Sequence, residues 1–125
     1  MGYRTVRTAD VEPTPDRPCE LRRLTEAAGL NHVALNRYSA EPGEMIPLTY
    51  HYHTEQEEAF YVISGEIAVE TPDRTVTLGA DELFAADAES PHRAYCPTDA
   101  DTTAEVLAIG APQTSSDAEP YEPDA

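Results

Sequence analysis

The sequence predicts an all-β domain, either a sandwich or a barrel. Between residues 33 and 109 the chain breaks into short runs of alternating or continuous apolar residues. Turn-forming groups such as Glu41-Pro42-Gly43 and Ser64-Gly65 separate these runs. Short strands at this spacing are typical of sandwiches and barrels. We predict strands at Val33–Ser39, Met45–His53, Ala59–Ile63, Glu66–Glu70, Thr75–Leu78, Glu82–Ala85, Arg93–Cys96 and Ala104–Ile109.

The N-terminal segment shows no strand pattern. Its prolines, the last of them Pro18, predict an irregular and extended stretch. Leu21, Leu24 and Ala28 have helical spacing, so we expect one short helix that ends at Gly29.

The C-terminal residues 112–125 are rich in proline, serine, threonine and acidic groups. A segment of this composition buries too little apolar surface to offset the entropy of ordering. We therefore predict a single domain over residues 1–111, with a barrel core at about 33–109, followed by a flexible and disordered acidic tail over 112–125.

The chain is strongly acidic, with 24 Asp and Glu against 8 basic residues and a formal charge of −16. All the basic residues are arginines. Such a surface repels itself unless salt screens it, so the sequence predicts a halophilic protein over the alternative of an ordinary acidic one. The charge also argues against nucleic acid and anionic membranes as partners.

Cys19 and Cys96 are too few and too far apart for a disulfide framework or a zinc knuckle. No apolar run is long enough to span a membrane, and the first residues lack a signal-peptide pattern. We expect a soluble cytoplasmic protein with free thiols.

One short stretch carries the strongest chemical signal. His51 and His53 lie two residues apart, so on a strand both imidazoles point to the same face. A turn after His53 would bring Glu58 back beside them. Imidazole and carboxylate together suit Zn, Fe, Mn, Co, Ni or Cu. A structural role for two surface histidines is the alternative.

The run from Gly43 to Gly65 resembles the first motif of the cupin superfamily. His51-x-His53 is followed by four residues and Glu58, and then by six residues and Gly65, as in the family pattern. Only the spacer after Gly43 differs, with seven residues in place of five. The resemblance covers most of the chain from about 33 to 109 and implies a jelly-roll β-barrel, usually dimeric.

A second cupin motif is present in altered form. Gly79-Ala80-Asp81 and Pro91-His92-Arg93 resemble its two ends, but the family's proline, glycine and asparagine fall on Asp87, Glu89 and Cys96. The loop before His92 therefore differs from the family pattern. The metal ligands that the resemblance implies are His51, His53, Glu58 and His92.

The strand after the histidines is apolar on both faces. Phe60 and Val62 alternate with Ala59, Tyr61 and Ile63, so one face lines a core and the other needs a cover. A second copy of the chain or the N-terminal segment could supply that cover, and we expect a homodimer.

These observations predict a metal-binding cupin, a metal-dependent enzyme that acts on a small metabolite by Lewis-acid or oxygen chemistry, like an isomerase or a dioxygenase. The alternatives are a non-catalytic cupin that binds metal or a small ligand as a sensor or storage module, and a scaffold with a vestigial site. The sequence identifies no catalytic residue. Because it assigns no arginine beside the metal, we expect a partly apolar ligand rather than a sugar phosphate.

Overall fold

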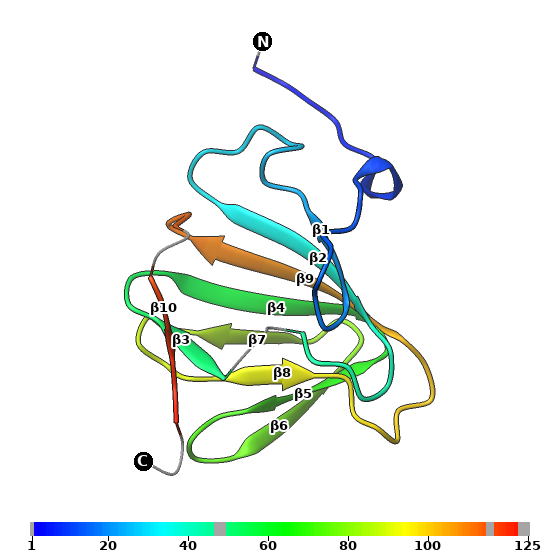
Figure 1. Ribbon diagram of the computed structural model, residues 1–125, viewed down its shortest axis with the longest axis vertical. Helices are drawn as coiled ribbons and strands as arrows, with labels where there is room; N and C mark the ends of the chain where they lie inside the picture. The colour runs from blue at the N-terminus through cyan, green and yellow to red at the C-terminus, as the bar shows by residue number, and fades with distance from the viewer. Residues whose placement is uncertain (1, 47–49, 115–116, 123–125) are drawn as a thin grey trace.

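The protein is all-β, as the sequence predicts. The computed structural model describes residues 2–46, 50–114 and 117–122, and Figure 1 shows their path. A five-stranded antiparallel sheet has the order β1-β2-β9-β4-β7, a three-stranded sheet the order β6-β5-β8, and β10 pairs with β3. The strands are β1 Glu20–Arg23, β2 Ala34–Ala40, β3 His51–His53, β4 Glu57–Ser64, β5 Glu66–Glu70, β6 Thr75–Gly79, β7 Leu83–Ala86, β8 Arg93–Tyr95, β9 Ala104–Ala111 and β10 Ala118–Pro120.

Two isolated β-bridges extend the three-stranded sheet toward β3, and together these elements form the second wall of the barrel. Met45 pairs with Tyr95, and His51 pairs with His92, both in antiparallel fashion. In Figure 1 the five-stranded sheet lies above β8, β5 and β6, with β3 and β10 closing one end. The end that β3 and β10 close carries the histidines.

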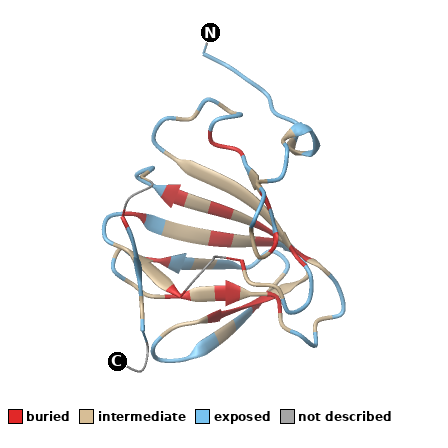
Figure 2. Cartoon of the chain, viewed as in Figure 1, coloured by how far each residue is buried: buried red, intermediate tan, exposed pale blue. Residues whose placement is uncertain are grey.

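The core lies between the two walls. Along β9 buried and half-buried residues alternate, with Val106 and Ala108 facing inward, and Phe60 and Val62 do the same on β4 (Figure 2). Ile67 of β5 contributes from the opposite wall and is fully buried. This alternation gives β4 an inner face that can also carry Glu58, two residues before Phe60.

The N-terminal segment is irregular, as predicted, apart from a short 3-10 turn η1 at Thr8–Asp10. The predicted helix at Leu21 to Ala28 is wrong. Residues 20–23 form strand β1 instead, because they pair with β2 along the edge of the large sheet, and the chain turns at Gly29 with a positive φ. Tertiary pairing has overridden a weak helical pattern.

The predicted strands otherwise recur with shifts of one or two residues, except that of Met45–His53 only the last three residues form a strand, and 47–49 lie outside the described residues. No helix in the described part of the chain is long and apolar enough to cross a membrane.

The C-terminal segment differs from the expected flexible tail at residues 117–122. Ala118–Pro120 pair with β3, and the backbone N–H of Tyr121 donates to the carbonyl of Tyr50. The Tyr121 ring also packs on the Tyr50 ring at a centroid distance of 5.0 Å. An open strand edge accepts this segment despite its polar composition, since backbone hydrogen bonds need no apolar side chains.

Candidate metal centre

His51 and His92 are cross-strand partners although they lie in different parts of the chain. The backbone N–H of His92 donates to the carbonyl of His51 at 2.9 Å, and the reverse hydrogen bond is 3.2 Å. Residues paired in this way direct their side chains to the same face. Their ring centroids are 5.0 Å apart, so both imidazoles project together into the barrel.

Glu58 reaches the histidines from the opposite wall. Its Oε1 lies 2.8 Å from Nε2 of His92, 3.6 Å from Nε2 of His53 and 4.0 Å from Nε2 of His51. The Nε2 atoms of His51 and His53 are 3.2 Å apart. His51, Glu58 and His92 each offer a ligand atom within 4.8 Å of the other two, which makes them a group that could hold a metal ion.

The outward nitrogens of two histidines have fixed partners. Nδ1 of His92 donates to the carbonyl oxygen of Ser90 at 2.8 Å, since a carbonyl can only accept. Nδ1 of His53 donates to Oδ1 of Asp117 at 2.9 Å. Burial raises the pKa of Asp117, but hydrogen bonds from His53 and from the backbone N–H groups of Gln56 and Glu55 outweigh it, and the net shift is downward. Asp117 is thus an ionised acceptor.

Because the outward nitrogens are used in this way, the inward-facing Nε2 atoms of His53 and His92 and the Glu58 carboxylate bring several lone pairs close together. With hydrogen on Nδ1, a neutral His53 or His92 presents a bare Nε2 to the Glu58 carboxylate, which is itself an acceptor. Two acceptors 2.8 Å apart need a cation or a proton between them. Burial lowers the pKa of His92, yet the hydrogen bond and the charge of Glu58 outweigh it and raise the pKa overall. Without a metal, a proton on His92 fills this position; the imidazole nitrogens and the carboxylate are also ligand types that suit a divalent transition metal.

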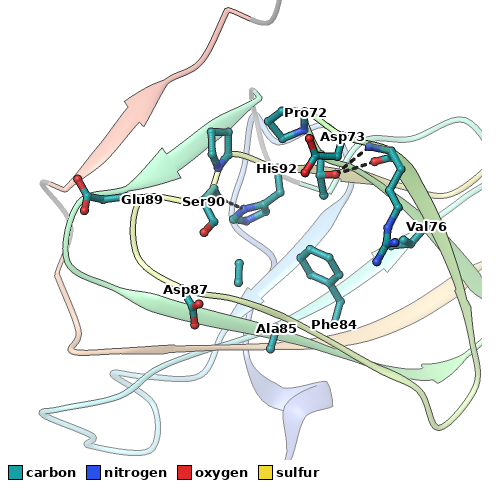
Figure 3. A pocket seen from close by; sticks show the side chains of 13 residues that line it. Pro72, Asp73, Val76, Phe84, Ala85, Asp87, Glu89, Ser90 and His92 are labelled. Atoms are coloured by element: carbon teal, nitrogen blue, oxygen red, sulfur yellow. Dashed lines mark hydrogen bonds between the residues drawn. The ribbon is translucent and has the colours of Figure 1, made fainter.

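The loop before His92 still directs this histidine to the site, although its sequence departs from the family motif. Glu89 stands where the family has glycine, and its φ of 67° lies in the left-handed region that glycine favours. Its backbone N–H donates to the carbonyl of His53 at 2.6 Å. Figure 3 shows the Glu89 side chain directed away from His92, while Ser90 holds the imidazole. The departure from the motif therefore leaves His92 at the site.

Two cavities flank the histidines. The smaller, of about 590 Å³, is lined by His92, Phe84 and the 87–91 loop (Figure 3). The larger, of about 970 Å³, is lined by His51, His53 and Glu58 together with groups from the N-terminal segment and β2. The metal-ligand group therefore faces a space large enough for a small organic molecule.

Sequence reasoning missed three residues at this site. Asp117 lies in the segment expected to be a tail, and no local pattern links it to His53. Arg17 and Arg23 line the larger cavity, although no arginine was expected beside the metal. The pairing of β1 with β2 brings Arg23 there, Arg17 lies in the segment just before β1, and no local sequence pattern indicates that pairing.

The other predicted residues fall as the strand alternation requires. Tyr50 is buried away from the cluster, and Arg93 points opposite to His92 and pairs with Glu70 at 2.9 Å. Cys96 is buried inside the barrel, and His32 is exposed. Glu55 and Glu57 are exposed too, whereas Glu58 is half-buried and lies on the same face of β4 as Phe60 and Val62.

A two-walled β-barrel with a histidine and carboxylate cluster at one end defines a recognisable class of small metal-binding barrels. The family model described as the cupin domain matches residues 36–110. The chain belongs to the cupin family. The comparison with curated proteins gives no match.

Solved structures agree on the fold. A protein assigned as a sugar phosphate isomerase from Acidithiobacillus ferrooxidans is 26% identical with a TM-score of 0.67, over 74% of this chain and 58% of its own length. A polyketide cyclase from Streptomyces resistomycificus is 21% identical with a TM-score of 0.72, over 92% and 89% of the two chains. A predicted oxalate decarboxylase from Thermotoga maritima is 21% identical with a TM-score of 0.74, over 88% and 100%. The present chain therefore spans less than two thirds of the first of these.

Proposed function

We propose that the protein binds one divalent transition metal through His51, His53, Glu58 and His92 and acts with it as an enzyme on a small metabolite. The observation that carries the proposal is the convergence of His51, Glu58 and His92, whose ligand atoms all lie within 4.8 Å of one another, with Oε1 of Glu58 2.8 Å from Nε2 of His92. A group of acceptors this close is stable only around positive charge.

The surrounding residues supply the support that such a centre needs. Asp117 and the Ser90 carbonyl orient the imidazoles of His53 and His92 from outside, as is usual for histidine ligands. The rings of Phe60 and Phe84 lie 5.7 and 6.0 Å from the His92 ring and limit the access of water to it. When bound, a metal ion would supply Lewis-acid polarisation of an oxygen atom on the molecule in the cavity.

The similar structures support an enzyme without choosing its reaction. Their names include an isomerase, a cyclase and a decarboxylase, each of which requires a polarised oxygen or a stabilised negative charge. The metal itself stays open among Zn, Fe, Mn, Co, Ni and Cu, since such ligand sets follow metal availability as much as affinity.

The test has two stages. Protein purified without added metal is expected to retain about one equivalent of a transition metal, and His51→Ala and Glu58→Gln are expected to lose it. Retention of less than about a tenth of an equivalent would contradict metal binding. Metal-loaded protein is then screened by NMR for conversion of sugar phosphates and small carboxylic acids, with His51→Ala as control. Tight, metal-dependent binding without any conversion would favour the non-catalytic alternative.

We also propose that a second copy of the chain covers the outer face of the large sheet. Tyr61 and Leu83 are cross-strand partners on that face, where Leu83 is 57% and Ile63 41% exposed. Neighbouring apolar groups at this exposure favour association. Sedimentation is expected to give twice the monomer mass for the wild type and the monomer mass for Leu83→Glu. A wild-type monomer at high concentration would contradict the proposal.

A further inference from the structure

The arginines of this chain divide into two groups. Most of them contact an acidic side chain or a backbone carbonyl, and these are Arg4, Arg7, Arg22, Arg37 and Arg93. Arg17, Arg23 and Arg74, by contrast, make no side-chain hydrogen bond or ion pair with any residue that the structure describes; Arg17 and Arg23 both line the larger cavity, and Arg74 lines the smaller one. In a chain with 24 acidic residues and 8 arginines, unpaired cations at one cavity call for an explanation.

The sheet register fixes where Arg23 stands relative to the metal-ligand group. Arg23 of β1 is the partner of Asn36 on β2, Asn36 is the partner of Ala108 on β9, and Ala108 is the partner of Phe60 on β4. Partners across a sheet share a face, so these four side chains form one row on the inner face, in which Arg23, Asn36 and Phe60 line the cavity and Ala108 is buried in the core. The row is apolar at Phe60 and Ala108 and polar at Asn36 and Arg23.

Glu58 lies two residues before Phe60 on the same face of β4, next to the apolar end of this row. Three strand spacings of about 4.8 Å separate β4 from β1, and Glu58 lies two residues along β4 from the row of Arg23, so the two backbones are about 16 Å apart if the sheet is treated as flat. The long arginine side chain closes part of that gap. A small molecule in the cavity can therefore lie beside Phe60 and Asn36 with one end at the metal-ligand group and the other at the guanidinium.

Tyr38 shows that both arginines act on the same space. The pKa of Tyr38 is raised to about 12, first by burial and then by the charge of Glu58, while the charges of Arg17 and Arg23 act in the opposite direction. The phenol thus lies within electrostatic reach of both ends of the cavity. Its hydroxyl forms no hydrogen bond within the described parts of the chain and remains a possible donor to a ligand.

Acidic groups at the cavity do not neutralise these arginines. Glu26 and Glu119 also line it, but both are exposed, and no ion pair joins either of them to Arg17 or Arg23 in the described chain. Two guanidinium groups, of the half-buried Arg17 and the exposed Arg23, line one cavity without partners in the described chain and offer a site for a carboxylate or a phosphate, which arginine binds through paired N–H donors.

We infer that Arg17 and Arg23 bind the anionic group, a carboxylate or a phosphate ester, of the molecule that fills the larger cavity. The inference rests on the proposed function for the other end of that molecule, where the metal is expected. It extends the expectation of a partly apolar ligand: the ligand is a small organic anion whose apolar middle section lies beside Phe60.

The experiment measures the binding of three probes by calorimetry, at the lowest salt concentration that keeps the protein folded. Benzoate and phenyl phosphate carry the two candidate anions, and benzamide matches benzoate in shape without its charge. Metal-free protein is used first, so that neither anion can bind through a metal. The variants are Arg17→Gln and Arg23→Gln, and Arg74→Gln is the matched control because Arg74 lines the other cavity.

Metal-free wild type and Arg74→Gln are expected to bind an anion at least about tenfold more tightly than benzamide. Arg17→Gln and Arg23→Gln are expected to lose that preference and to bind benzamide like the wild type. Stronger binding of phenyl phosphate identifies a phosphate ester, and stronger binding of benzoate a carboxylate. Anion binding that ignores both substitutions, or no preference for anions in the wild type, would overturn the inference.

Metal content separates this inference from the proposed function. Both arginine variants are expected to retain as much metal as the wild type. If the wild type holds no metal and anion binding still depends on the arginines, the proposed function fails and the inference stands. If metal is retained and the arginines have no effect on anion binding, the inference fails and the proposed function stands.

Discussion

Nδ1 of His53 lies 2.9 Å from Oδ1 of Asp117, a residue that follows it by 64 positions. The other oxygen of Asp117 accepts the backbone N–H groups of Glu55 at 3.1 Å and Gln56 at 2.9 Å. One buried carboxylate thus holds both an imidazole and the turn after β3. The C-terminal segment therefore belongs to the site.

The substitution Asp117→Asn tests this role. It keeps the size of the side chain but removes the charge that orients His53, so we expect metal affinity to fall about 10- to 100-fold. Competition with a chromogenic chelator measures it. The control is Glu119→Gln, an exposed residue two positions further on, in β10, that should leave affinity unchanged. Equal affinities for wild type and Asp117→Asn would show that His53 does not need this partner.

Gly65 tests the structural part of the family motif. Its φ is +78°, and a Cβ there would lie 2.7 Å from the carbonyl oxygen of Thr103, a backbone atom that cannot easily move. We expect Gly65→Ala to lower the free energy of unfolding by about 2 kcal/mol or more in urea titrations. Gly79→Ala is the control, because a Cβ there meets only the Glu82 side chain, at 3.7 Å. Similar costs for both variants would refute the steric argument.

The buried thiol of Cys19 predicts that the folded protein loses stability at high pH. Burial, aided by the charges of Glu44 and Glu20, raises the pKa of Cys19 from 9.0 to about 12. Above pH 9 the unfolded chain therefore releases a proton that the folded state keeps, and the free energy of unfolding falls until about pH 12. Each such group adds a slope of up to about 1.4 kcal/mol per pH unit. Urea titrations from pH 8 upward should give a shallower slope for Cys19→Ala, and an unchanged slope would contradict this origin.

The net charge of −16 predicts that stability depends on salt. Lowering salt from 1 M to 0.1 M lengthens the screening distance from about 3 to about 10 Å, which strengthens repulsion among the acidic groups. The thermal midpoint should fall over this range. A variant with Asp73→Asn, Asp99→Asn and Asp101→Asn, three exposed positions, should show a weaker dependence. Full stability of the wild type in dilute buffer would count against a halophilic protein.

The sequence predicts the barrel because strand alternation and turn residues are local signals, and it groups the histidines with Glu58 because parity and spacing are local too. Asp117, Arg17 and Arg23 reach the site through β10 and β1, which form only when an open sheet edge accepts them. Such pairing depends on the partner strand rather than on the segment's own composition. For the same reason residues 20–23, with their helical spacing, form a strand.

The most direct test of the metal centre is the electron density of the purified protein at the point where the four side chains converge. The account predicts one ion about 2.0 to 2.2 Å from Nε2 of His51, His53 and His92 and from a carboxylate oxygen of Glu58. A site with no ion, in which His92 and Glu58 share only a proton in protein that was never exposed to chelator, would contradict it.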